Sequence, residues 1–237
     1  MMKNLARRLI NISYSKKVIG AFIIVLFVPL ILLGFFSNKI LIEQLEKQQQ
    51  KSIEYTSTTA DETFQDFETR AGSYVTILAN DERVKMALSE KNRGLLTKDL
   101  ANFYATIKQD GVDFVEIIDA TGSVFVSGHN MRKYGDDRSN EEIIQLALSG
   151  ERAGSIIIDT IGMVFLSSGP IYNDSQTIIG AVSVGYFIEN DVVDKIKKMS
   201  GADITIFQRG RSIASTIETH GERWVDYKIT NETILST

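Results

Sequence analysis

A run of nineteen residues, 18–36, contains no charged, amide or hydroxyl side chain. A helix rises 1.5 Å per residue, so a helix of this length spans about 30 Å, the thickness of the hydrocarbon core of a bilayer. Five basic residues precede the run, and no Asp or Glu lies among the first seventeen residues. The positive-inside rule therefore predicts a cytoplasmic tail at residues 1–17, a transmembrane helix at residues 18–36 and an extracytoplasmic remainder.

The apolar run is longer than the core of a cleaved signal peptide, which has about 7–15 residues. Its exit carries Phe35 and Phe36 where a cleavage site requires small residues. Pro29 is compatible with this interpretation, because proline is tolerated in membrane helices. We expect an uncleaved, single-pass anchor in the cell (inner) membrane, with the lipid bilayer as a partner.

The chain beyond the tail is acidic. Removing the five basic residues of the tail from the 26 Lys and Arg residues leaves 21, against 30 Asp and Glu, which is a formal charge of −9 from residue 18 onward. This balance argues against nucleic acid as a partner. The chain has no Cys, and its two histidines, His129 and His220, are too few and too far apart in sequence for a zinc site. We expect neither a metal nor a cofactor.

Residues 37–80 predict one long stalk helix that continues out of the membrane. The segment has no Pro and a single Gly. Apolar side chains in its second half recur at alternating steps of four and three, as in a heptad repeat. These residues are Ala60, Phe64, Phe67, Ala71, Tyr74 and Leu78, and the last five are the candidates for a dimer seam. The seam either packs on the sheet of its own domain or pairs with a second copy in a parallel homodimer, and both can hold on different faces of the helix.

The segment at residues 81–200 predicts short helices and five strands. We expect helices at 82–88, 97–109, 141–148 and 191–199, and strands at 114–118, 123–127, 154–158, 163–168 and 178–187. A hairpin turn begins at Asp119 and ends at Gly122. Residues 139–142 are expected to cap the third helix, and residues 170–175 to form a turn.

After Gly201 the pattern of two short strands starts again, at residues 204–207 and 211–217. This repetition predicts that residues 201–237 begin a second, smaller module. The last four residues, 234–237, have the pattern of a helix that is interrupted.

Several segments occur in the order and spacing of a known family. They are GVDFVEIIDATG at residues 111–122, YGDD at 134–137, ALSG at 147–150, GPIY at 169–172, IGAVSVGY at 179–186, GADITIF at 201–207 and IAST at 213–216. In this arrangement the chain resembles Cache domains, the extracytoplasmic PAS-like sensor modules of bacterial chemoreceptors, sensor histidine kinases and diguanylate cyclases. The last two segments resemble the start of the second subdomain in double Cache sensors.

The resemblance implies an α+β fold, in which a transmembrane helix and a long stalk helix precede a PAS-like antiparallel five-stranded sheet. It places a membrane-distal Cache domain at residues 81–200. The implied function is the ligand-sensing region of a membrane-bound signal-transduction receptor of the chemoreceptor or sensor-kinase type, which binds a small molecule of unknown identity and transmits through the long helix. The alternative is a membrane-anchored module that binds a periplasmic protein and no small molecule.

The ligand site is expected between the sheet and the polar loop at residues 128–139. The candidate ligand-binding residues are Ser127, His129, Arg132, Tyr134, Ser167 and Ser168. Arg132 offers a planar fork of donors, and His129 adds pH dependence, so these two are the best candidates for orienting a ligand.

Other ligand classes and chemistries are less consistent with the sequence. Related citrate- and dicarboxylate-sensing domains carry basic residues where this chain has Val124 and Leu166, and the Tyr-Arg-Trp-Tyr cluster of double Cache amino-acid sensors is not found. The chain also has no Gly-x-Ser-x-Gly elbow, no His-Glu-x-x-His motif and no phosphate-binding loop. We therefore expect no catalytic residues and a protein that is not an enzyme.

Overall fold

The structure is a computed structural model that describes residues 14–159 and 162–228. The chain divides into two compact units, Met1–Glu54 and Tyr55–Thr237. Helix α2 (Tyr14–Ala79) supplies the described part of the first unit and the first element of the second. Most of the expected cytoplasmic tail and the expected interrupted helix at residues 234–237 lie outside the described residues.

The first unit contains the apolar run found in the sequence. The helix continues through Pro29 without a break. The side chains described between residues 18 and 35 are all exposed. Within the described residues, α2 is the single helix whose length and composition suit a membrane crossing.

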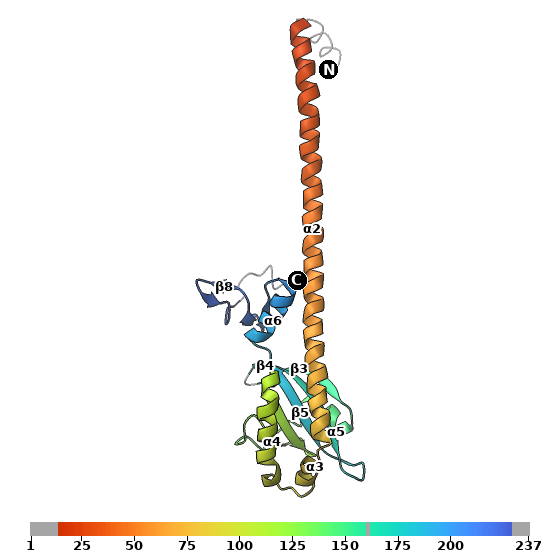
Figure 1. Cartoon of the computed structure of the whole chain (residues 1–237), viewed down its shortest axis with the longest axis vertical. Coiled ribbons are helices and arrows are strands. Elements are labelled where there is room, and N and C mark those ends of the chain that lie inside the picture. The colour runs from red at the N-terminus through yellow and green to blue at the C-terminus, as the bar shows by residue number, and fades with distance from the viewer. Residues whose placement is uncertain (1–13, 160–161, 229–237) are drawn as a thin grey trace. The chain divides into compact units, whose positions relative to one another are not determined.

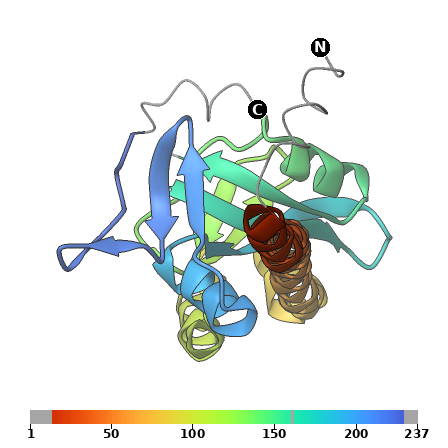
Figure 2. The same ribbon diagram turned by 90° about the horizontal axis from the view of Figure 1, so that it is seen from above.

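The second unit is built on a five-stranded antiparallel sheet (Figures 1 and 2). Its strands are β1 (Phe114–Asp119), β2 (Val124–Ser127), β3 (Ala153–Asp159), β4 (Gly162–Tyr172) and β5 (Ile178–Phe187), in the order β2-β1-β5-β4-β3. The two strands that flank the centre, β1 and β4, both pair with β5. The prediction of five antiparallel strands is confirmed.

The connection between β1 and β2 follows the predicted turn chemistry. The Asp119 carboxylate accepts hydrogen bonds from the backbone N–H groups of Thr121 (2.8 Å) and Ser123 (3.2 Å). Gly122 has a φ of 86°, a left-handed conformation that glycine adopts without strain. A side-chain acceptor and a glycine therefore fix this tight turn locally.

Three helices cover one face of the sheet, which we call the α2 face. They are the C-terminal part of α2, α3 (Glu82–Ser89) and α4 (Gly94–Ile107), and a 3-10 turn, η1 (Lys108–Asp110), follows α4. Figure 2 shows α2 and α4 on the same side of the sheet. Buried side chains of these helices pack on the strands in one apolar cluster that includes Val75, Val84, Leu100, Ile117 and Val184. Burying a side chain of this size contributes about 1.5–3 kcal/mol.

Within the described residues, one helix, α5 (Glu142–Ser149), packs on the opposite face, which we call the α5 face. Ile143, Ile144 and Ala147 contact the apolar side chains of Phe114 and Leu166. The helix ends at Gly150, which has a φ of 103°. The apolar core beneath α5 is smaller than the core on the α2 face. It lies on the side of the sheet on which the loop at residues 128–139 begins.

The expected cap of α5 is corrected by the structure. Glu141 occupies the N-cap position and makes no side-chain cap hydrogen bond. Ser139 instead belongs to the loop, because its backbone N–H donates to the Asp137 carboxylate at 2.9 Å. This local turn competes with a helix cap for the same polar groups.

The expected turn at residues 170–175 is also corrected, since β4 continues through Pro170 to Tyr172. β3 pairs with β4 only as far as Ser168, whereas β5 pairs with β4 beyond it. Pro170 thus lies where β4 has a partner on one side alone, and such edge positions tolerate a missing N–H. The turn begins after Tyr172.

The sheet domain is followed by helix α6 (Asn190–Ser200), which ends at Gly201 with a φ of 75°. Two small hairpins come next, and their strands are β6 (Thr205–Gln208), β7 (Arg211–Ser215), β8 (Glu218–Thr219) and β9 (Glu222–Arg223). The two strands expected after Gly201 are therefore present, and they form a separate two-stranded sheet.

Candidate ligand site

A row of four polar side chains crosses the α5 face of the sheet. Glu116 of β1 lies opposite Ser127 of β2 and opposite Ser183 of β5, and Ser183 lies opposite Ser168 of β4. Residues directly opposite each other in antiparallel strands place their side chains on the same face. All four residues are fully buried. We call these residues the polar row.

Glu116 distinguishes the polar row from an ordinary buried sheet. Successive side chains of a strand point to opposite faces, so Glu116 shares its face with Phe114 and Ile118, which pack in the α5-side core. The exposed fraction of its side chain is 0%. Burial of a carboxylate costs free energy unless a charged or hydrogen-bonding partner compensates for it.

Arg138 is the charged partner of Glu116, and it comes from the loop before α5. Its Nε lies 3.5 Å from Glu116 Oε2 and 3.2 Å from Glu141 Oε1. The guanidinium lies 5.0 Å from the centre of the Phe114 ring, and 6% of the side chain is exposed. The loop holds this position because the Arg138 backbone N–H donates to the Gly122 carbonyl at 2.9 Å.

His129 is the third polar side chain beside Glu116. Its ring stacks on Phe114 with 4.5 Å between ring centres, and its Nδ1 lies 3.1 Å from the Ser127 hydroxyl. Its Nε2 lies 4.0 Å from Glu116 Oε1. A carboxylate, an imidazole and a guanidinium therefore meet in one buried space.

Burial raises the pKa of Glu116 to about 7, although the positive charges of Arg138 and Lys133 oppose the shift. Within the described residues, neither carboxylate oxygen of Glu116 accepts a hydrogen bond. Buried polar groups in native proteins are nearly always hydrogen-bonded, and an exception calls for a water, an ion or a ligand. The unsatisfied carboxylate therefore marks this cluster as a candidate binding site.

The serines at the other end of the polar row are satisfied internally. The Ser168 hydroxyl donates to the Val182 carbonyl at 2.9 Å and lies 2.9 Å from the Ser183 hydroxyl. The unmet hydrogen-bonding capacity of the polar row is thus concentrated at Glu116.

A comparison with protein families matches residues 46–231 to dCache_3, described as the double sensory domain of two-component sensor kinases. The match includes α2 from residue 46 onward, the whole five-stranded sheet and both small hairpins. The chain belongs to this double Cache family. It is therefore a sensory domain of the kind described for two-component sensor kinases.

Solved structures share the double Cache fold. The sensor domain of the V. cholerae histidine kinase DctB has a TM-score of 0.58 and 13% identity, over 80% of this chain and 72% of that chain. The ligand-binding domain of the Campylobacter jejuni chemoreceptor Tlp3, in complex with L-valine, has a TM-score of 0.53 and 19% identity, over 76% and 75%. The periplasmic domain of Vibrio cholerae LuxQ has a TM-score of 0.55 and 15% identity, over 74% and 83%. No curated protein sequence matches the chain.

The structure brings together three of the six residues expected to bind a ligand. Ser127, His129 and Ser168 lie on the α5 face, at the polar row or beside it. Ser167 is buried but faces α2, where its hydroxyl oxygen lies 4.0 Å from the position a Cβ would take at Gly72. The assignment of these residues to a ligand stays a prediction.

The other two candidates lie at the surface of the loop at residues 128–139. The Arg132 side chain is exposed, and its backbone N–H donates to the Asn130 side chain at 3.2 Å. Tyr134 is also exposed, and the guanidinium of Arg93 lies 3.4 Å from the centre of its ring. Neither residue lies in the cluster around Glu116.

The five dimer-seam candidates contact the core of their own domain. Ala71 and Leu78 are buried, and Phe64, Phe67 and Tyr74 pack against the α2-face cluster. Phe67 stacks on Tyr186 of β5, with 4.6 Å between ring centres. Packing on the chain's own sheet, one of the two sequence-based alternatives, is therefore present, and the homodimer stays a prediction.

Sequence reasoning did not select Glu116 and Arg138. The available signal was an acidic residue at an inward position of an apolar strand, which is unusual unless the charge has a partner. Within residues 14–159 and 162–228, no group of three or more His, Asp or Glu side chains could hold a metal ion.

Proposed function

We propose that this double Cache chain is the extracytoplasmic sensory region of a membrane-bound receptor, anchored by the apolar part of α2. The basic tail, the exposed apolar helix and the acidic remainder support this orientation. The similar structure of LuxQ is that of a periplasmic domain, which is consistent with the same compartment.

The proposed ligand is a small molecule with a cationic group, which binds beside Glu116 on the α5 face. The observation that carries this proposal is a fully buried carboxylate whose oxygens accept no hydrogen bond from the described residues. An ammonium group would supply both a charge and hydrogen-bond donors. The ammonium group of the ligand would thus supply the hydrogen-bond donors that the described residues do not provide to Glu116.

The same cluster offers a complementary group for an anion. Arg138 lies beside Glu116 with its Nε also facing Glu141, and the planar fork of a guanidinium can bind a further carboxylate. A zwitterion of the α-amino acid type therefore matches the pair, with its ammonium at Glu116 and its carboxylate at Arg138. The related Tlp3 domain was solved with L-valine, which supports this class although the Tyr-Arg-Trp-Tyr cluster is absent here.

Binding would be transmitted through the sheet to α2. The polar row occupies one face of β1 and β5, and Ala71 and Val75 of α2 pack on the other face of the same sheet. Packed interfaces respond to a ligand by small discrete shifts of helices rather than by continuous deformation. A shift of α2 would carry the signal toward the membrane.

Calorimetric titration of the full chain in detergent micelles with the standard L-amino acids tests this function. We expect at least one ligand to bind, and Glu116→Gln to weaken it about tenfold, because a charge-assisted hydrogen bond contributes about 1.5–3 kcal/mol. Glu142→Gln is the matched control, since Glu142 is exposed at the start of α5. Equal affinity in the Glu116→Gln variant would overturn the site, and no binding by any amino acid would favour a protein partner.

A further inference from the structure

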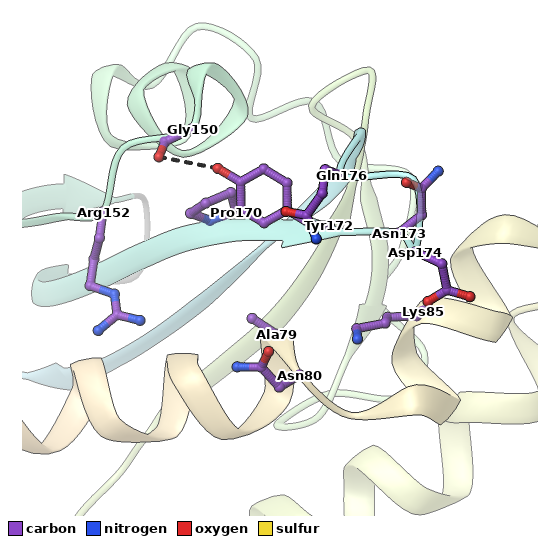
Figure 3. Close-up of a pocket in the computed structure, with 10 residues that line it drawn as sticks. All are labelled: Ala79, Asn80, Lys85, Gly150, Arg152, Pro170, Tyr172, Asn173, Asp174 and Gln176. Carbon is purple, nitrogen blue, oxygen red and sulfur yellow. Dashed lines mark hydrogen bonds between the residues drawn. The ribbon is translucent and has the colours of Figure 1, made fainter.

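A cavity lies in the sheet domain, away from the polar row. Its volume is about 480 Å³, and none of the four polar-row residues lines it. The walls come from the end of α2, from α3, from the segment between α5 and β3, and from the hairpin between β4 and β5 (Figure 3). This size is within the range of small-molecule sites. We call it the Arg152 cavity.

Arg152 is held in place at one side of the cavity. Its Nη2 donates to the Thr76 hydroxyl on α2 at 2.7 Å. Its Nη1 lies 3.8 Å from the Cβ position of Gly72, and its Nε lies 3.6 Å from that of Gly169. The guanidinium therefore lies between the last turns of α2 and strand β4, in a position defined by both elements.

The remaining charges of the cavity lie at its other end. Lys85 of α3 forms an ion pair with Glu82 at 2.8 Å. The negative charge of Asp174 also helps to raise the pKa of Lys85. Figure 3 shows Lys85 beside Asp174 and Arg152 on the opposite side, with the rings of Pro170 and Tyr172 between them. In the described part of the chain, no carboxylate pairs with Arg152. Of the two cations that line the cavity, Arg152 is thus the one without a carboxylate partner among the described residues.

We infer that the Arg152 cavity is a second binding site, which takes a small organic carboxylate. The carboxylate bonds to the fork of guanidinium donors on Arg152, and the body of the ligand packs on the rings of Pro170 and Tyr172. Arginine suits this task because its donors are planar and match the two oxygens of a carboxylate. The amide side chains that line the cavity, Asn80, Asn173 and Gln176, can form hydrogen bonds with polar substituents of the ligand.

Occupation of this site would act on the same helix as the polar row. Thr76, Ala79 and Asn80 lie at the C-terminal end of α2, and the ligand would join them to the β4–β5 hairpin. The site is independent of the proposed function, because its residues are separate from Glu116 and Arg138. Two ligands of different charge would thus both shift the conformation of the same helix, α2.

The test is a thermal-shift titration of the full chain in detergent micelles with benzoate, at constant ionic strength. Benzamide is the uncharged isostere, and sodium chloride controls for screening. We expect saturable stabilisation by benzoate at concentrations up to roughly 10 mM, because a single charge-assisted contact gives Kd values near the millimolar range. No saturable shift, or an equal shift with benzamide or chloride, overturns the proposal.

Variants then locate the site. We expect Arg152→Gln to weaken benzoate about tenfold, which corresponds to the loss of a charge-assisted bond. Arg209→Gln, an exposed arginine in the β6–β7 turn, removes the same charge and should leave affinity unchanged. If Arg152→Gln fails to fold, Arg152→Lys keeps the charge and removes the fork, and we expect weaker binding there too. Unchanged affinity in the folded Arg152 variant overturns the assignment.

Discussion

Glu116 and Arg138 meet at 3.5 Å on the α5 face of the sheet, one from the strand β1 and the other from the loop before α5. Both side chains are almost completely buried. Such a pair is a poor source of net stability, because the desolvation of two charges offsets most of their attraction. Its presence in a sensor domain is better explained by a ligand or by a change of protonation.

The first prediction concerns pH. The pKa of Glu116 is raised from 4.5 to about 7, so between these values the folded state binds a proton that the unfolded state has released. The free energy of unfolding should therefore fall as the pH rises from 4.5 to 7, by up to about 3 kcal/mol. Urea denaturation of the full chain in micelles at a series of pH values measures this.

Glu116→Gln provides the control for this pH dependence. The amide cannot titrate, so the fall in stability between pH 4.5 and 7 should be largely lost in this variant. Asp137→Asn is a matched comparison: hydrogen bonds to Ser139 lower the pKa of Asp137 below its usual value of 3.8, so it titrates below this window and its removal should leave the fall between pH 4.5 and 7 unchanged. An identical pH profile for wild type and Glu116→Gln would contradict the assignment of the shift to this residue.

The second prediction is a coupling between the two charges. Arg138→Met leaves the Glu116 carboxylate without its cation, and we expect a loss of stability that approaches about 3–5 kcal/mol only well above pH 7, because the carboxyl, whose pKa is already about 7, stays protonated at lower pH in the variant. Glu116→Gln combined with Arg138→Met should recover much of this loss, because no buried charge remains. A double-mutant cycle by urea denaturation measures the interaction, and strict additivity would show that the two groups do not interact.

The strands of this domain were predictable because their signals are local. The alternation of apolar residues in β1 and the Asp119–Gly122 turn act over a few positions, and the turn forms through hydrogen bonds to Asp119 itself. The extension of β4 past Pro170 was not predictable in this way. Pairing with β5 decides it, because Pro170 lies opposite Ala181 of β5, and the turn residues do not show where that pairing ends.

The candidate site was predictable only in part, because part of it forms through contacts between segments that are separate in the sequence. Ser127 and His129 belong to the strand end and loop that the sequence singled out. Glu116 and Arg138 come together because the loop folds back through the Arg138–Gly122 backbone bond. The sequence displays an acidic residue within an apolar strand, but it does not display the arginine that compensates for the charge.

The third prediction is the membrane topology. Reporter fusions after Asp113 should be active in the extracytoplasmic compartment, and fusions after Lys17 should be inactive there, because the positive tail retains the N-terminus inside. Alkaline phosphatase and green fluorescent protein fusions give opposite readouts of each position. Activity of the phosphatase at Lys17 together with its absence at Asp113 would reverse the orientation.

The last prediction concerns the seam of α2. Phe67 is packed between Phe64 and Tyr186. Phe67→Ala should therefore lower the free energy of unfolding by about 2–3 kcal/mol. This loss is toward the lower end of the range for buried phenylalanine, because the side chain is only half-buried. Glu62→Ala, at an exposed position of the same helix, should change stability by less than about 0.5 kcal/mol. Urea denaturation monitored by circular dichroism measures both.

The predicted homodimer needs a separate measurement, because a seam variant that unfolds the domain also removes any interface. Sedimentation of the native chain in micelles should show a dimer that dissociates on dilution. Phe64→Asp should shift this equilibrium to monomer, since an unpaired charge in an apolar seam is costly. If Phe64→Asp is folded and sediments as wild type does, the seam serves the domain's own core and the dimer forms elsewhere. If the native chain is monomeric at all concentrations, the dimer prediction is wrong, and α2 transmits within a single chain.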